Sequence, residues 1–200
     1  MKRSVVAAAV MVVLGACGHM PGGEKSSGWV TLIDASSLGN WNRVGEANWR
    51  VADGAVVADK GVGFLVTRQT YGDFELKAEF YADNDTNSGI FIRCQDPQKL
   101  GSDNCYEVNI FDTRPKPEHG TGAIVDVVAV KEPRPKAGGR WNTFHVTAKG
   151  DHLVVFMNGI KTAEAHDRKH ARGVIGLQHA AGVKGDTSPI KFKKVEIRPL

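Results

Sequence analysis

The sequence predicts an all-β domain made of two packed antiparallel sheets, and three observations support this fold class. From Trp29 onward, short apolar or alternating segments are divided by Gly, Pro, Asn and Asp, which is typical of strands joined by turns. No stretch of this region sustains a 3.6-residue apolar period, so we expect almost no helix. About a dozen such segments are more than one open sheet holds without curling or splitting, so two sheets are expected.

The expected strands are apolar runs or alternating segments bounded by turn residues. In the segment 73–82, the apolar residues from Phe74 to Phe80 fall on one face and charged residues fall on the other, which predicts one buried and one solvated face. Asn158-Gly159 is typical of a tight hairpin turn. The full set of expected strands covers 29–33, 48–58, 63–68, 73–82, 88–95, 105–112, 122–130, 141–149, 152–158, 160–166, 173–179 and 190–198.

The first 28 residues predict export and membrane attachment. Met1 to Arg3 is basic, and residues 4–14 are apolar but too few for a comfortable membrane-spanning helix, as in a signal peptide. Leu14-Gly15-Ala16-Cys17 resembles a bacterial lipobox, in which the cysteine thiol is lipidated. We therefore expect a signal peptide over 1–16, acylation at Cys17 and a Gly/Ser-rich tether over 17–28. An ordinary signal peptide with an incidental cysteine is the alternative.

The residue after the lipobox predicts where the protein is anchored. Gly18 stands where an aspartate would favour retention in the inner membrane. The expected location is therefore the cell envelope, with a lipid anchor in the outer membrane and the domain facing the periplasm. Residues 29–200 are expected to form a single domain, because no linker or internal repeat interrupts them.

Charge and cysteine content narrow the class of partner. The formal net charge of +4 falls to +2, with 24 basic and 22 acidic residues, once Lys2 and Arg3 leave with the signal peptide, so a nucleic-acid partner is not indicated. Cys94 and Cys105 remain, an even pair in an exported protein, which favours a disulfide across the loop between two strands. Two free buried thiols are the alternative, and the spacing is not that of a zinc site.

Several polar residues stand in otherwise apolar strands. Ile90-Phe91-Ile92 is apolar on both faces, which predicts a strand inside its sheet, and Arg93 shares the parity of Phe91. Glu107 and Gln178 interrupt two other strands in the same way, and nearby glycines leave room for a ligand. We expect Arg93, Glu107 and Gln178 to converge on one surface. A structural Arg93–Glu107 ion pair inside the sheet is the alternative.

Histidines and loop residues add weaker candidates. His119 lies in a Pro/Gly-rich loop, 113–126, that is long enough to cover a groove, although a solvated loop is the simpler interpretation. Asp112 ends a strand, where it either orients a basic group or caps a turn, and His179 is either catalytic or a hydrogen-bonded core residue. No HExxH, P-loop, GxSxG or dinucleotide motif is present, so metalloprotease, NTPase and α/β-hydrolase chemistry have no support.

Ten segments taken together resemble the 3-keto-disaccharide (3-keto-glycoside) hydrolase domain family. They are, in order, "WVTLIDASSLGNW" (29–41), "WRVADGAVVA" (49–58), "GFLVTRQTYGDFELKAEF" (63–80), "NSGIFIR" (87–93), "YEVNIFD" (106–112), "GTGAIVD" (120–126), "WNTFHVTAKG" (141–150), "FMNGIKT" (156–162), "GVIGLQHA" (173–180) and "IKFKKVEIRPL" (190–200). The resemblance implies a concanavalin A-like jelly-roll sandwich. Asn109 and Val125 depart from the glutamine and tyrosine of many members, which bears on substrate choice.

The chemistry that the resemblance implies starts from the acidity of a sugar oxidised at C3. A base removes the C2 proton, the C1 substituent leaves by β-elimination, and water adds back. Glu107, His119 or His179 would be the base, and Arg93 would stabilise the enolate oxygen. The residues expected to bind sugar hydroxyls are Asn87, Ser88, Asp112 and Gln178.

The resemblance leaves the cofactor and the class of protein open. No cofactor is required by the sequence, and a divalent metal ion that replaces or assists Arg93 is an alternative. The expected partner is a small carbohydrate, supplied by a sugar 3-oxidoreductase. A non-catalytic carbohydrate-binding lipoprotein is the rival interpretation, because sandwiches of this type also serve as lectin modules. A structural envelope lipoprotein without a small ligand is the third.

Overall fold

The computed structural model describes residues 28–200. The expected signal peptide over 1–16, the lipidated Cys17 and all but the last residue of the expected tether lie outside this range. Within the described range, no helix is long and apolar enough to cross a membrane.

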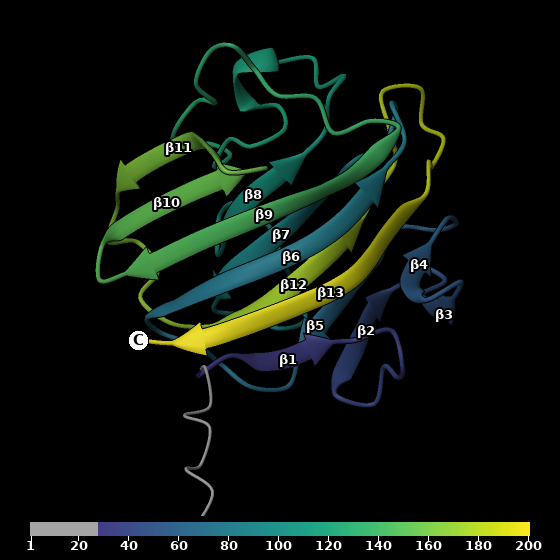
Figure 1. Cartoon of the computed structure of the whole chain (residues 1–200), viewed down its shortest axis with the longest axis horizontal. Coiled ribbons are helices and arrows are strands. Elements are labelled where there is room, and N and C mark those ends of the chain that lie inside the picture. The colour runs from purple at the N-terminus through teal and green to yellow at the C-terminus, as the bar shows by residue number, and fades with distance from the viewer. Residues whose placement is uncertain (1–27) are drawn as a thin grey trace, which may run out of the picture.

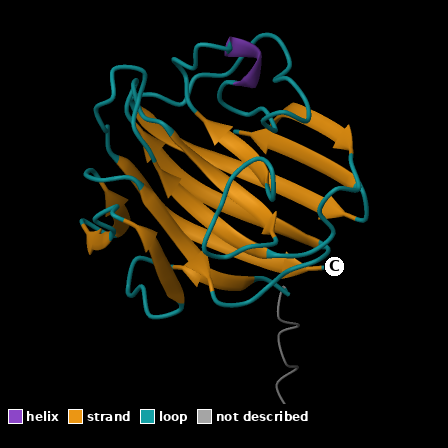
Figure 2. Cartoon of the chain, turned by 180° about the vertical axis from the view of Figure 1, so that it is seen from behind, coloured by secondary structure: helices purple, strands orange, loops and turns teal. Residues whose placement is uncertain are grey.

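Two antiparallel sheets pack face to face, as the sequence predicts (Figure 1). The eight-stranded sheet has the order β11-β10-β9-β6-β13-β4-β3, with β1 beside β13, and the five-stranded sheet has the order β2-β5-β12-β7-β8. Figure 2 shows the molecule from the side of the five-stranded sheet. The strands are β1 (Val30–Ile33), β2 (Trp41–Gly45), β3 (Arg50–Ala52), β4 (Ala55–Ala58), β5 (Gly63–Thr67), β6 (Phe74–Ala82), β7 (Ser88–Cys94), β8 (Tyr106–Ile110), β9 (Arg140–Lys149), β10 (His152–Met157), β11 (Ile160–His166), β12 (Val174–His179) and β13 (Ile190–Pro199).

Three elements differ from the sequence prediction. Strand β2 was not among the expected strands, and the expected strand 48–58 is a hairpin whose turn at Asp53-Gly54 has positive φ at both residues. The expected strand 122–130 is a loop, because positive φ angles at Gly122 (+88°) and Asp126 (+59°) interrupt the extended backbone. Helix is confined to a single 3-10 turn, Pro117–His119, in the part of the chain that the structure describes.

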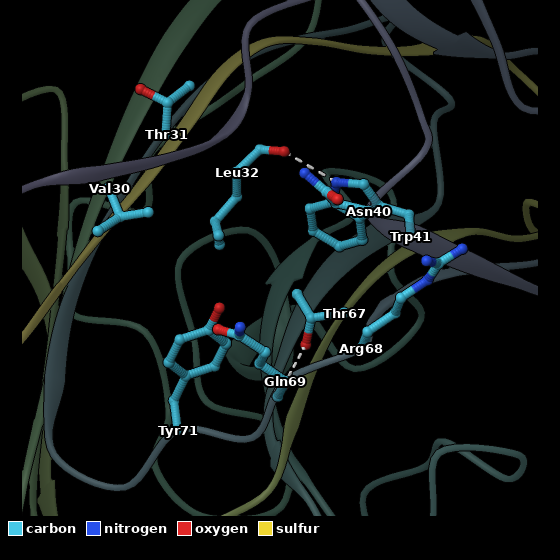
Figure 3. Close-up of a pocket in the computed structure, with 9 residues that line it drawn as sticks. All are labelled: Val30, Thr31, Leu32, Asn40, Trp41, Thr67, Arg68, Gln69 and Tyr71. Atoms are coloured by element: carbon cyan, nitrogen blue, oxygen red, sulfur yellow. Dashed lines mark hydrogen bonds between the residues drawn. The ribbon is translucent and has the colours of Figure 1, made fainter.

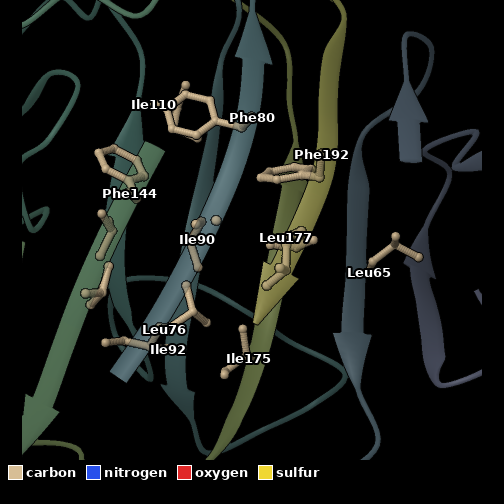
Figure 4. Close-up of a cluster of buried hydrophobic side chains, with 14 of the residues drawn as sticks. Leu65, Leu76, Phe80, Ile90, Ile92, Ile110, Phe144, Ile175, Leu177 and Phe192 are labelled. Carbon is tan, nitrogen blue, oxygen red and sulfur yellow. The ribbon is translucent and has the colours of Figure 1, made fainter. Parts of the chain in front are cut away.

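The core lies between the two sheets and is built from the inward faces of their strands (Figure 4). The alternation predicted for 73–82 is confirmed in β6, where every second side chain from Phe74 to Phe80 is buried. Phe80 packs on Phe144 of β9 with ring centroids 4.8 Å apart, and Leu177 of β12 belongs to the same cluster from the other sheet. Each such buried side chain contributes roughly 1.5–3 kcal/mol to folding.

The five-stranded sheet is also covered on its outer face, which explains why Ile90-Phe91-Ile92 is apolar on both sides. Phe91 belongs to a second apolar cluster with Val66, Val174 and the two half-cystines. Strand β7 lies between β12 and β8, inside its sheet as expected. The outer face of this sheet therefore excludes water from part of its surface, and this partly dry surface is where Glu107 and Gln178 lie.

The expected disulfide joins Cys94 to Cys105 and closes the loop between β7 and β8. Closing a loop with a sequence separation of 11 residues is expected to stabilise the domain by about 3 kcal/mol. We expect the double substitution Cys94→Ser/Cys105→Ser to lower the free energy of unfolding by that amount, measured by urea denaturation. Dithiothreitol should produce the same loss in the wild type and none in the variant. An unchanged midpoint in both experiments would contradict this role.

Candidate active site

Glu107 lies on the outer face of the five-stranded sheet, over a glycine of the neighbouring strand. The register of β7 and β8 sets Phe91 opposite Glu107 and Gly89 opposite Asn109. A Cβ atom added at Gly89 would lie 3.4 Å from both Cγ and Oε1 of Glu107. The absence of a side chain at Gly89 therefore leaves the space into which the carboxylate leans.

Gln178 reaches the same place from the other side of β7. Leu177 pairs with Ile90, and the next step of this antiparallel register sets Gln178 opposite Gly89. Ser88 Oγ donates a 2.6 Å hydrogen bond to the backbone carbonyl of Gln178 and is fully buried. The Ser88 hydroxyl, expected to bind substrate, is thus committed to joining two strands.

Three oxygen acceptors gather around Gly89 without donors. Within the described residues, Asn109 Oδ1 and Gln178 Oε1 are buried and have no hydrogen-bond partner. The carboxylate of Glu107 also makes no hydrogen bond to the described residues, and this residue is 8% exposed. Buried polar atoms are nearly always paired, so the two unpaired amide oxygens, on the same sheet face as this carboxylate, indicate a ligand that brings its own donors. Sugar hydroxyls are donors of this kind.

The environment of Glu107 favours its protonated form. Burial raises the pKa of Glu107 to about 7, the negative charge of Asp126 acts in the same direction, and the guanidinium of Arg114 opposes them. A carboxyl group with this pKa is divided between acid and base near neutral pH. It is therefore suited to take a proton from a weak carbon acid and to give one back.

The loop 113–126 runs along the free edge of β8 and brings His119 to the site. Val125 N donates to Glu107 O at 3.0 Å, and the backbone N–H of Gly122 donates to Asn109 O at 2.9 Å. Asn109 Nδ2 donates to His119 O at 2.6 Å. The expected covering loop is thus held to the strand that carries Glu107.

The ring of His119 has a defined orientation. Its Nδ1 accepts a hydrogen bond from the backbone N–H of Asp126 at 3.1 Å. In the neutral ring the proton is therefore on Nε2, which makes this nitrogen a donor. The His119 side chain is 21% exposed, so a ligand has access to it.

Arg93 lies elsewhere, and the expectation that it shares a face with Phe91 is wrong. Its φ of +53° is left-handed, and the pairing of β7 with β12 changes register between Val174 and Gly176. This bulge breaks the two-residue alternation, so the side chain turns into the interior and is fully buried. Neither the expected convergence with Glu107 nor the alternative ion pair with it is formed.

The guanidinium of Arg93 instead closes one end of the sandwich. It donates to the carbonyl oxygens of Gly72 at 2.8 Å, Gly150 at 2.7 Å and His170 at 3.2 Å, and to Asp73 Oδ1 at 3.0 Å. Burial lowers the pKa of Arg93 and the charge of Asp73 raises it, and an arginine remains charged in either case. These contacts join the start of β6 to two loops, which is a structural role.

The other expected site residues make structural contacts. His179 is fully buried between Gly61 O at 2.7 Å and Ser188 O at 3.1 Å, the core histidine of the alternative interpretation. Asp112 accepts hydrogen bonds from Thr121 Oγ1 and from the backbone N–H groups of residues 137 and 138, so it caps a turn. Asn87 is half-buried, and its Nδ2 donates to the carbonyl of residue 181 at 2.6 Å.

Two functional candidates were not assigned from the sequence. Asn109 is named above only as a departure from the family pattern, and Arg114 is not among the expected site residues. The alternation of β8 was the signal for Asn109. No local signal marks Arg114, because the return of its loop toward β8 is a tertiary feature.

The site residues show which side chains could bind the divalent metal ion that the resemblance left open. Among residues 28–200, no three His, Cys, Asp or Glu side chains gather in a metal-binding arrangement. An ion at this site would have Glu107 as its carboxylate ligand and the amide oxygens of Asn109 and Gln178 beside it. Hard divalent ions accept such oxygen ligands.

A separate cavity of about 250 Å³ lies beside β1, β2 and the end of β5 (Figure 3). Trp41 and Tyr71 line it, and the Trp41 indole N–H is committed to Leu32 O at 2.9 Å. None of the three unpaired acceptors lines this cavity. It is therefore distinct from the candidate active site.

Comparison with solved structures supports the fold and a link to carbohydrates. A protein of Parabacteroides distasonis, provisionally named a glycosyl hydrolase, is 27% identical, with a TM-score of 0.71 over 86% of this chain and 99% of that one. A second protein of that organism with the same provisional name is 18% identical, with a TM-score of 0.75 over 90% and 98% of the chains. The carbohydrate-binding module CBM66 of Bacillus subtilis is 16% identical, with a TM-score of 0.59 over 78% and 94%. The last two show the fold alone.

The amino-acid sequence matches a protein family but no individual curated protein. No curated protein matches the chain. The model of one family, described as the 3-keto-alpha-glucoside-1,2-lyase-like domain, matches residues 28–198. The chain therefore belongs to the 3-keto-alpha-glucoside-1,2-lyase-like family, which confirms the resemblance, the jelly-roll fold and a carbohydrate-related hydrolase or lyase function.

Proposed function

We propose that this protein cleaves 3-keto-glycosides, with Glu107 as the base that removes the C2 proton. The observation that carries the proposal is the Glu107 carboxyl group, which is buried, lacks a hydrogen-bond partner among the described residues and has a pKa raised to about 7. Beside it stand two unpaired amide oxygens, those of Asn109 and Gln178. A lectin site has no need of a carboxyl group with a shifted pKa.

The proposed reaction begins with proton removal at C2. Glu107 takes the proton from C2, and the electrons of that C–H bond form an enediolate across C2 and C3. The C1–O bond then breaks, its electron pair leaves with the aglycone oxygen, and that oxygen takes a proton. As that bond breaks, the C3 ketone is restored and a C1=C2 double bond forms. The hydroxyl group of water then adds to C1, Glu107 returns its proton to C2, and the remaining proton of the water replaces the one given to the aglycone.

Two loop residues suit the charges that develop. Arg114 acts on Glu107 through its positive charge, and in this proposal it stabilises the enediolate oxygen, the role first given to Arg93. His119 has a donor at Nε2 and is suited to protonate the departing aglycone oxygen. Asn109 and Gln178 would accept hydrogen bonds from the sugar hydroxyls.

The decisive assay is turnover of a 3-keto-disaccharide, measured as the release of the second sugar. Release with an enediolate-derived glycal intermediate supports the proposal, and a parallel reaction with a chelator reports the metal requirement. The rival carbohydrate-binding interpretation predicts binding of the 3-keto sugar without any product. Binding without product would reject the proposal that the protein is an enzyme.

The pH dependence follows from the raised pKa of Glu107. Only the carboxylate accepts the C2 proton, so we expect kcat/KM to rise with pH and to level off above about 7. The measurement is initial rate at low substrate from pH 5 to pH 9. A profile that levels off below pH 5 would show that Glu107 is not the titrating base.

The cellular setting stays a proposal from the N-terminal sequence. We propose that Cys17 is acylated and anchors the protein to the outer membrane, facing the periplasm. The substrate carries a ketone at C3, so an oxidoreductase that oxidises glycosides at this carbon must supply it. Retention of the protein in the membrane fraction, lost on Cys17→Ser, tests the anchor.

A further inference from the structure

A second cavity on the five-stranded sheet lies at the end of β12 remote from Gln178. Its volume is about 420 Å³, and β2, the ends of β5 and β12, and the loop closed by the disulfide form its walls. The side chains that could bind a ligand there are Arg68, Arg172, Thr70, Asn42, Gln95 and Gln98. No Asp or Glu lines the cavity, so its lining carries two positive charges and no negative one.

The two arginines are available for a ligand. Neither forms an ion pair within residues 28–200, whereas other arginines of the domain do, such as Arg50 with Asp59. Arg172 is oriented by Thr70, because its Nε donates to Thr70 Oγ1 at 3.0 Å and one terminal nitrogen donates to Thr70 O at 2.9 Å. Arg68 lies between the two cavities and lines both of them, and in Figure 3 its side chain extends away from Tyr71. A concave site with uncompensated positive charge attracts anions.

The disulfide loop connects this cavity with the candidate active site. Gln95 and Gln98 wall the cavity, and Leu100 of the same loop covers Gly176, where an added Cβ atom would lie 2.2 Å from Leu100 Cδ2. Gly176 is the neighbour of Phe91 across the strands, and Phe91 is the neighbour of Glu107. The two sites therefore share one sheet face and meet at Leu100.

The spacing suits a ligand of two rings. Val174 lines the cavity and Gln178 belongs to the candidate active site, and they are four residue steps apart on the strand, a distance of about 13 Å. A ligand with a sugar ring over Gly89 and a C1 substituent that passes over Leu100 along β12 would reach the arginines. The guanidinium group matches a carboxylate with two parallel hydrogen bonds.

We propose that Arg68 and Arg172 bind a carboxylate on the leaving group of the substrate, so that the preferred substrates are 3-keto-glycosides of acidic aglycones or uronic acids. The identity of the sugar in this statement rests on the proposed function, whereas the anion site rests on the arginine cavity. The charge of the leaving group, rather than its shape alone, then selects the substrate.

The test separates the anion site from catalysis. The full-length protein is titrated with 4-carboxyphenyl α-D-glucoside and with phenyl α-D-glucoside, neither of which has the C3 ketone needed for turnover, and binding is measured by calorimetry. The carboxylate should bind about tenfold or more tightly, and salt should weaken it. Arg68→Gln/Arg172→Gln should abolish the difference, and the matched control Arg134→Gln, an exposed arginine paired with Glu132, should leave it unchanged.

Each outcome bears on one proposal. Equal affinity for the two glucosides, no binding of the carboxylate, or a preference that persists in the double variant would overturn the anion site. A charge preference in a protein that never cleaves a 3-keto-glycoside would support the anion site and reject the proposed function. Cleavage of acidic and neutral 3-keto-glycosides with equal kcat/KM would reject the anion site alone.

Discussion

Replacing Glu107 by glutamine is expected to lower kcat/KM for a 3-keto-disaccharide by about 10³-fold or more while the protein stays folded. Glutamine has the same shape but accepts no proton, so the C2 hydrogen loses its acceptor. The outer face of the sheet is otherwise unchanged, because Glu107 makes no hydrogen bond to the described residues and leans into the space above Gly89. The measurement is product release by wild type and variant at pH 8, where the wild-type carboxyl group is ionised.

The same substitution is expected to change the pH dependence of stability. The pKa of Glu107 rises from an ordinary 4.5 to about 7 on folding, so the folded state binds the proton more tightly than the unfolded state. This contribution is fully present below the unfolded pKa and is lost as the pH rises through the folded pKa. The wild type should lose about 3 kcal/mol of this contribution between pH 4.5 and pH 8, and Glu107→Gln should not.

Taken together, the two readouts distinguish a base from a structural carboxylate. A catalytic base held in a dry site predicts lost activity with stability gained at high pH. A structural Glu107 predicts lost stability at every pH, with activity falling only as the protein unfolds. Glu79→Gln, on the solvated face of the other sheet, is the matched control and should change neither readout. Unchanged turnover by Glu107→Gln would remove the proposed mechanism.

The strands could be predicted because their patterns are local. Segment 73–82 alternates strictly, and β6 is buried on the predicted face. The segment 122–130 has strand-like composition, but left-handed residues at Gly122 and Asp126 turn it into a loop that covers β8. That loop is stabilised by bonds to β8 and to Thr162 of β11, contacts that no pattern within the segment reveals.

The site could be predicted where side-chain alternation holds. Glu107 and Gln178 follow the parity of their strands, and their expected common face is the one observed. Arg93 follows the same parity in the sequence, but the bulge at the end of β7 reverses it. A bulge depends on how two strands pair, so the alternation of one strand does not contain it. The positive charge that acts on Glu107 comes instead from Arg114, in the loop after β8.

Arg93→Met is expected to lower the free energy of unfolding by about 3–5 kcal/mol, the largest stability effect that we predict. The side chain is fully buried, and its loss leaves the carbonyl oxygens of Gly72, Gly150 and His170 without their donor. Arg93→Lys keeps the charge but lacks the planar fork that reaches these groups, so an intermediate loss is expected. Urea denaturation measures both variants.

A turnover measurement on the same variants decides whether Arg93 has only this structural role. Because its guanidinium is committed to the end of the sandwich and not to Glu107, the folded fraction of Arg93→Lys should cleave 3-keto-glycosides with kcat/KM within a few-fold of the wild-type value. Arg134→Met is the matched control, an exposed arginine in a loop whose loss should change stability by no more than about 0.5 kcal/mol. A stable Arg93→Lys protein that loses turnover about as severely as Glu107→Gln would return Arg93 to the reaction centre, because stabilisation of the sandwich alone cannot produce that combination.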